Sequence, residues 1–185
     1  MRKLFTALLC AAAFCTANAA HAAVLNFNDP GEIVIDNDTF IATYTESGFA
    51  ISGAAATFLP LDSALVGGID GSTPFSLKDA GGGSFSLLSL DYGFYDLGFG
   101  AAAGMLSVTG LLNGLQVASQ MFSLGAGAMG SFGAAFGNVT EVTFSGTSGF
   151  SIDNVNVTPV PEPETVALMA LGLLALGWRV RRRVR

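Results

Sequence analysis

Apolar and polar residues alternate with a period of two over much of the chain between residues 23 and 158. Leu106 and Val108, for example, alternate with Ser107 and Thr109. Alternation of this kind is typical of β-strands that place one face on a core. The pattern predicts strands over residues 24–27, 32–35, 40–45, 49–52, 84–90, 105–109, 115–122, 139–145 and 150–157.

Glycine-rich breaks separate most of these predicted strands, and the 24 glycines of the chain argue against long helices. The two longest breaks, residues 59–83 and 125–137, are predicted to be loops. Many short strands joined by turns indicate a sandwich or a jelly roll. We therefore predict an all-β, jelly-roll-like β-sandwich ectodomain over residues 23–158. A cleavable signal helix is expected at residues 1–22, and a sorting segment with one transmembrane helix at residues 159–185.

The sorting segment combines an uncharged apolar run with an arginine-rich end. The run extends over the 14 residues from Thr165 to Trp178, so a helix there would be about 21 Å long. This is shorter than the roughly 30 Å hydrocarbon core of a bilayer. Arginines beside a span stay on the cytoplasmic side, so the preceding domain is expected outside the cytoplasm. The expected stop-transfer arginines are Arg179, Arg181, Arg182, Arg183 and Arg185.

Pro161-Glu162-Pro163 stands directly before this apolar run. The order of Pro-Glu-Pro, apolar segment and arginine-rich end resembles the PEP-CTERM sorting signal of Gram-negative bacteria, and the resemblance covers residues 160–185. It implies that an exosortase, a membrane-embedded processing enzyme, recognises Pro-Glu-Pro and removes the tail. It also implies an inner-membrane intermediate that later reaches the outer surface or the extracellular space.

The other end of the chain also predicts export. Met1-Arg2-Lys3 is followed by an apolar stretch over residues 4–14 and by two small-x-small sites that end at Ala19 and Ala22. Cleavage is expected between Ala22 and Ala23, with the site after Ala19 as the alternative. Cys10 and Cys15 both precede these sites, so the exported domain contains no cysteine and no disulfide.

The predicted domain is strongly acidic. Between residues 23 and 158 the sequence holds twelve Asp or Glu residues and one base, Lys78, for a net charge of −11. Nucleic-acid binding relies on lysine and arginine that neutralise phosphates, so this composition argues against a nucleic-acid partner. Divalent cations are a better match to such a surface.

The alternation changes phase within the last predicted strand. Phe150 and Ile152 follow one phase and Val155 follows the other, which predicts a β-bulge at Asp153-Asn154. Residues 150–155 resemble the closing strand of carbohydrate-module-like jelly rolls. That resemblance implies a structural calcium held by Asp153 together with Asn28, Asp29 or Glu32. The alternative is a polar bulge that binds nothing.

Candidate catalytic groups are few. The predicted domain has neither histidine nor cysteine, which excludes Ser–His and Cys–His nucleophiles and zinc held by those ligands. A carboxylate pair is the remaining option, and Asp91 and Asp96 are the nearest pair, although a solvated turn is the favoured interpretation. Residues 125–130 match G-x-G-x-x-G, but no amphipathic helix follows, so this match is interpreted as a consequence of composition.

Two functions remain open from the sequence. The first is a non-enzymatic cell-surface or extracellular-matrix protein, which is sorted and processed at its tail. The second is a module that binds exopolysaccharide, for which Tyr92, Phe94 and Tyr95 are the candidate stacking platform. No cofactor is expected apart from the calcium discussed above. Exposure of the three rings in the folded domain would favour the second function.

Overall fold

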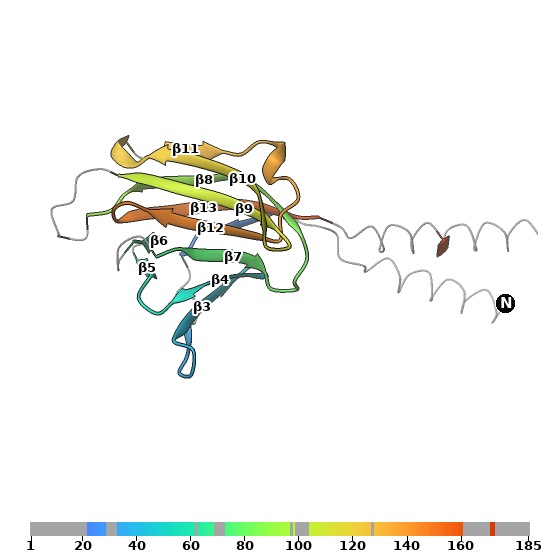
Figure 1. The fold of residues 1–185 in the computed structure, drawn as a ribbon, viewed down its shortest axis with the longest axis horizontal. Helices are drawn as coiled ribbons and strands as arrows, with labels where there is room; N and C mark the ends of the chain where they lie inside the picture. Colours follow the sequence, from blue (N-terminus) through green and yellow to red (C-terminus); the bar gives the residue numbers. More distant parts are fainter. Residues whose placement is uncertain are drawn as a thin grey trace, which may run out of the picture.

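The computed structural model describes residues 22–28, 33–61, 63–68, 73–96, 98, 104–126, 128–160 and 171–172. These residues form thirteen strands and two single-turn 3₁₀ helices (Figure 1). The strands are β1 (Ala23–Leu25), β2 (Ile33–Asp36), β3 (Ile41–Glu46), β4 (Phe49–Ala54), β5 (Phe58–Leu61), β6 (Ala64–Gly67), β7 (Phe75–Asp79), β8 (Phe85–Phe94), β9 (Met105–Leu112), β10 (Leu115–Ser123), β11 (Ala128–Ser131), β12 (Glu141–Gly146) and β13 (Phe150–Pro159). The 3₁₀ helices are η1 (Leu124–Ala126) and η2 (Ala134–Phe136).

The strands form two antiparallel sheets. One has seven strands in the order β10-β9-β12-β7-β4-β3-β2. The other has the order β11-β8-β13-β6-β5, and β1 also pairs with β13. The prediction of an all-β sandwich is confirmed at this level.

Pairing in the second half of the domain is nested. β9 pairs with β10, β8 with β11, β7 with β12, and β6 with β13. Along the sequence, the β9–β10 pair is therefore enclosed by β8–β11, then by β7–β12 and finally by β6–β13. The arrangement is that of a long hairpin whose successive strand pairs alternate between the two sheets. β13 receives β8 along one edge, whereas β6 and β1 share its other edge end to end.

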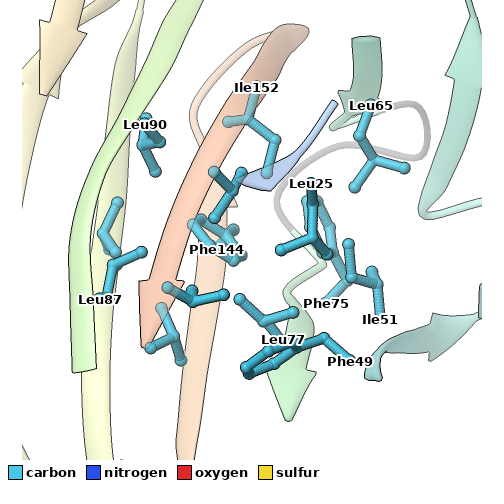
Figure 2. Close-up of a cluster of buried hydrophobic side chains, with 14 of the residues drawn as sticks. Leu25, Phe49, Ile51, Leu65, Phe75, Leu77, Leu87, Leu90, Phe144 and Ile152 are labelled. Atoms are coloured by element: carbon cyan, nitrogen blue, oxygen red, sulfur yellow. The ribbon is translucent and has the colours of Figure 1, made fainter. Parts of the chain in front are cut away.

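The core lies between the sheets and is rich in phenylalanine (Figure 2). The ring of Phe75 lies 5.3 Å from that of Phe58, 5.4 Å from that of Phe144 and 5.8 Å from that of Phe150, measured between centroids. Space there is so limited that a Cβ atom on Gly67 would stand 2.5 Å from the Phe150 ring. Aromatic packing of this kind supplies the burial that a domain without disulfides needs.

All nine predicted strands overlap observed strands, but β5, β6, β7 and β11 were predicted as loops. In β6 both Leu65 and Val66 are fully buried, so no alternation marks the strand. β11 contains only alanine, methionine, glycine and serine, which give little contrast between its faces. β7 alternates over five residues only, between a proline and a glycine cluster.

Both predicted membrane-related helices lie largely outside the described residues. Of the signal helix only the exposed Ala22 is described, and of the C-terminal span only Leu171 and Gly172, which are helical. Within the described residues, no helix combines the length and the apolar character needed to cross a bilayer.

Candidate functional site

The predicted bulge in β13 is confirmed. Asp153 pairs with Asp91 of β8, and the next pair is Asn156 with Ser89, so β13 contains one residue more than β8 over this stretch. The register shifts back directly afterwards, because Val157 pairs with Leu87. Asn154 has a left-handed backbone with φ of 48°. This conformation is tolerated by asparagine better than by most side chains, which explains why an asparagine suits the position.

The bulge places two carboxylates opposite each other on neighbouring strands. Asp91 and Asp153 are directly paired across β8 and β13. The side-chain amide of Asn154 lies between them, donating to Asp91 Oδ2 at 2.8 Å and to Asp153 Oδ2 at 3.3 Å. The backbone N–H of Asn154 also donates to Asp153 Oδ1 at 2.6 Å. Like charges directly opposite each other destabilise a sheet, and the amide offsets part of that repulsion.

A third carboxylate, Glu46 at the end of β3, contributes to the same region. Its oxygens accept hydrogen bonds from the backbone N–H groups of Asn26 at 3.0 Å and Phe27 at 3.2 Å, and from the Tyr44 hydroxyl at 3.0 Å. Glu46 therefore fixes the segment that leaves β1 beside the bulge. We call Glu46, Asp91 and Asp153 the acidic corner.

Burial raises the pKa of the Asp153 carboxyl, and the charges of Asp91 and Glu46 raise that pKa further. The hydrogen bond from the Asn154 N–H acts in the opposite direction but does not cancel the rise. The folded protein therefore binds the Asp153 proton more tightly than the unfolded chain does, so this carboxyl costs stability once pH rises through its raised pKa.

Replacing Asp153 by asparagine is accordingly expected to stabilise the protein at pH 7, by about 0.2–1 kcal/mol, the range for cross-strand charge pairs. An asparagine at this position keeps an oxygen for the Asn154 N–H. The gain should shrink as pH falls through the raised pKa of Asp153 and be small at about pH 3, below the ordinary aspartate pKa of about 3.9, where an aspartate is mostly protonated in both states. Urea unfolding at the two pH values measures it, with Asp38→Asn at an exposed turn as the control. A gain that is equal at both pH values would contradict this explanation.

The structure describes only part of the predicted calcium site. Asn28 donates its backbone N–H to Asn26 Oδ1 at 3.2 Å, whereas Asp29 and Glu32 lie outside the described residues. Among the residues that are described, no three His, Cys, Asp or Glu side chains are placed to hold a metal ion. Calcium binding by Asp153 thus stays a prediction.

If calcium does bind there, millimolar calcium should raise the melting temperature, because a ligand of the native state alone stabilises that state. Asp153→Ala should abolish the rise. Thermal melts with calcium and with chelator test this expectation. Equal melting temperatures in the two buffers would leave the bulge as a structural feature only.

The aromatic residues proposed as a sugar platform do not form an exposed surface. Tyr92 and Phe94 are partly buried and pack against the core. The Tyr92 ring lies 4.8 Å from that of Phe122. Tyr95 is half-buried, and its backbone N–H donates to the carbonyl of Gly149 at 3.1 Å. The arrangement gives no support to stacking of a sugar on these three rings.

The structure also describes the Asp91 and Asp96 pair and most of the G-x-G-x-x-G match. Asp91 belongs to β8 rather than to a turn, which corrects the solvated-turn interpretation for this residue. Asp96 follows the strand and accepts a hydrogen bond from the Gly98 N–H at 2.8 Å. Residues 125–130 run from η1 into β11, which pairs with β8, so a strand follows where a dinucleotide site requires a helix.

The processing sites lie at the borders of the described domain. β1 begins at Ala23, directly after the expected signal cleavage at Ala22. Pro161, Glu162 and Pro163 follow the last described residue of the sandwich, Val160, and lie outside the described residues, as do the arginines from Arg179 to Arg185.

Residues 159–183 match the family model of the PEP-CTERM protein-sorting motif. No curated protein matches the chain significantly. A crystal structure of a DUF4465 family protein from Bacteroides caccae is 11% identical with a TM-score of 0.43, and the alignment covers 79% of this chain and 96% of that chain. A likeness at this level carries no argument about function.

Proposed function

From the PEP-CTERM sorting signal that this chain carries, we propose that it is an exported, non-enzymatic cell-surface or extracellular-matrix protein. An exosortase-type enzyme recognises the signal, and processing takes place at the membrane. The segment after Pro163 anchors the chain in the inner membrane with the domain outside the cytoplasm. Removal of that segment then delivers the domain to the outer surface or the extracellular space.

The acidic, cysteine-free and histidine-free domain supports a non-enzymatic role. Three of its described carboxylates are engaged in structure: Glu46 holds the segment after β1, and Asp91 shares the Asn154 amide with Asp153. The net charge of −11 also makes nucleic acid an unsuitable partner.

The nested pairing of β6 with β13, β7 with β12, β8 with β11 and β9 with β10 supports a jelly-roll description of the sandwich. β1 to β5 then extend this unit at one side of each sheet. Such a fold serves many functions, so it supports a rigid display domain without naming a ligand.

Localisation tests the proposal. Cells with an exosortase should present the domain to protease added outside, or release it, whereas cells without one should retain it in the inner-membrane fraction. A domain that reaches the same fraction in both strains would overturn the proposed route.

Binding of an exopolysaccharide is a second candidate, and one observation favours it. The strand register lines up hydroxyl side chains from six neighbouring strands on the outer face of the seven-stranded sheet, and none of these side chains is charged. They are Ser119, Thr109, Thr143, Ser76, Ser52 and Thr43. Hydroxyls of this kind hydrogen-bond readily to neutral sugars. A glycan-array screen of the purified protein tests this candidate, and the absence of any binding would remove it.

A further inference from the structure

The first and the last strand of the domain place the two ends of the chain together. β1 is antiparallel to β13, and Ala23 at its start pairs with Val157 near the end of β13. β13 ends at Pro159, and the next residue, Val160, still donates its backbone N–H to the Ser84 carbonyl at 2.8 Å. The segments before Ala23 and after Val160 therefore leave the sandwich at one end, which we call the exit end.

Four turns lie around the exit end and are connected by hydrogen bonds. The carbonyl of Gly48, between β3 and β4, accepts the backbone N–H of Ala80, between β7 and β8, at 2.9 Å. The start of β8 exchanges two backbone hydrogen bonds with Val139, directly after the segment that contains η2. Asn113, between β9 and β10, donates its backbone N–H to Thr140 Oγ1 at 2.8 Å. The four turns are residues 47–48, 80–84, 113–114 and 132–138.

These four turns carry no charge, although the domain as a whole carries −11. They consist of glycine, alanine, serine, asparagine and phenylalanine only. On the adjoining strand ends, Asp79 accepts a backbone N–H of its own turn at 2.9 Å, and Glu141 pairs with Lys78 at 3.2 Å. By contrast, the connections at the opposite end of the sandwich hold the exposed Asp38 and Asp96.

The tether between the exit end and the predicted membrane span is short. Val160 and Thr165, where the apolar run begins, are five residue steps apart, so even an extended chain covers at most about 18 Å between them. The headgroup layer takes up about 5–8 Å of this length. A compact domain of this size has a radius of gyration of about 14 Å, so it is broader than the tether is long. The opposite end of the sandwich therefore cannot turn toward the bilayer.

We propose that the exit end faces the lipid headgroups while the chain is anchored, and that its four uncharged turns form the contact surface. This inference rests on the proposed function, because it requires anchoring before processing. A bilayer that contains anionic lipid repels acidic protein surfaces within about a Debye length, which is about 8 Å at 0.15 M salt. The tether already holds Glu162 and Glu164, so acids in the turns would add to this repulsion.

Quenching of a fluorescent label by lipid headgroups tests the proposal. The full chain, purified from cells without an exosortase, is placed in vesicles of phosphatidylglycerol and phosphatidylcholine that include headgroup-spin-labelled lipid. The exported domain has no cysteine, so a single substitution at an exposed residue gives one label. Ala80→Cys and Ala134→Cys label the exit end, and Thr39→Cys labels the opposite end. The labels at positions 80 and 134 should lose fluorescence, and the label at position 39 should keep it.

An added charge tests the contact surface itself. In the protein labelled at position 80, Ala134→Glu should weaken quenching in about 20 mM salt and do so less in about 150 mM, because salt screens the repulsion. Thr39→Glu is the matched control, since it adds the same charge at the opposite end and should leave quenching unchanged. Equal effects of the two substitutions would contradict a contact through the uncharged turns.

The outcomes separate this inference from the proposed function. A chain that does not stay with the vesicles would overturn anchoring, and the orientation would fall with it. A vesicle-bound chain whose labels at positions 39 and 80 are quenched equally would overturn the orientation alone. Quenching at position 80 that appears only after an exosortase is added would assign the exit end to the enzyme instead of the lipid, and would likewise overturn the inference.

Discussion

Replacing Phe75 by alanine is expected to remove about 3–5 kcal/mol of unfolding free energy, the usual cost of truncating a buried phenylalanine. Phe75 is 2% exposed, and its ring contacts those of Phe58, Phe144 and Phe150, which come from both sheets. The cavity would therefore open where the two sheets meet. No disulfide limits the unfolded chain, because both cysteines precede the expected signal cleavage.

Domains of this size have total stabilities of about 5–15 kcal/mol, so the variant should lose a third or more of that stability. Urea unfolding followed by fluorescence measures the loss. Phe40→Ala is the control, because Phe40 is 67% exposed and its change should stay within about 0.5 kcal/mol. Similar losses in the two variants would mean that the core is not organised around Phe75.

Replacing Pro161, Glu162 and Pro163 together by alanines is expected to trap the protein in the membrane, uncleaved. These residues end one position before the apolar run, which under the proposed route puts them within reach of an enzyme embedded in the membrane. The run remains in the variant, and so do the arginines that are proposed to fix its orientation, so export and anchoring should continue without processing. Membrane fractionation and immunoblotting in cells with an exosortase measure the effect.

Val160→Ala provides the control for this experiment, because it changes the neighbouring residue and leaves Pro-Glu-Pro intact. It should be processed like the wild type. Processing of the triple-alanine variant at the wild-type rate would show that the enzyme reads some other feature of residues 159–183.

Some features of the fold can be predicted from the sequence because they depend on residues that are close together along the chain. The alternation around Val108 and Val142 predicts β9 and β12, since one face of each strand is buried and the other is not. The change of phase between Ile152 and Val155 predicts the bulge, because an extra residue between them puts Val155 in the opposite phase of the alternation. By contrast, β6 was missed, because Leu65 and Val66 are both fully buried.

The candidate site is harder to predict from the sequence, because its residues are far apart along the chain. Asn154 and Asp91 are 63 residues apart and meet only because β8 pairs with β13. The sequence therefore suggested Asp96, five positions away, as the partner of Asp91. Likewise, only the sheet order shows that β2 lies at the end of its sheet among the described strands.

Intact-mass measurement of the protein from cells with an exosortase tests most directly whether the C-terminal tail is removed. The expected mature chain starts near Ala23 and lacks every residue from about Thr165 onward, the outcome of a removable tail signal. A mature protein whose mass still includes the C-terminal sequence through Arg185 would contradict removal of the tail, and the tail would then be an ordinary membrane anchor.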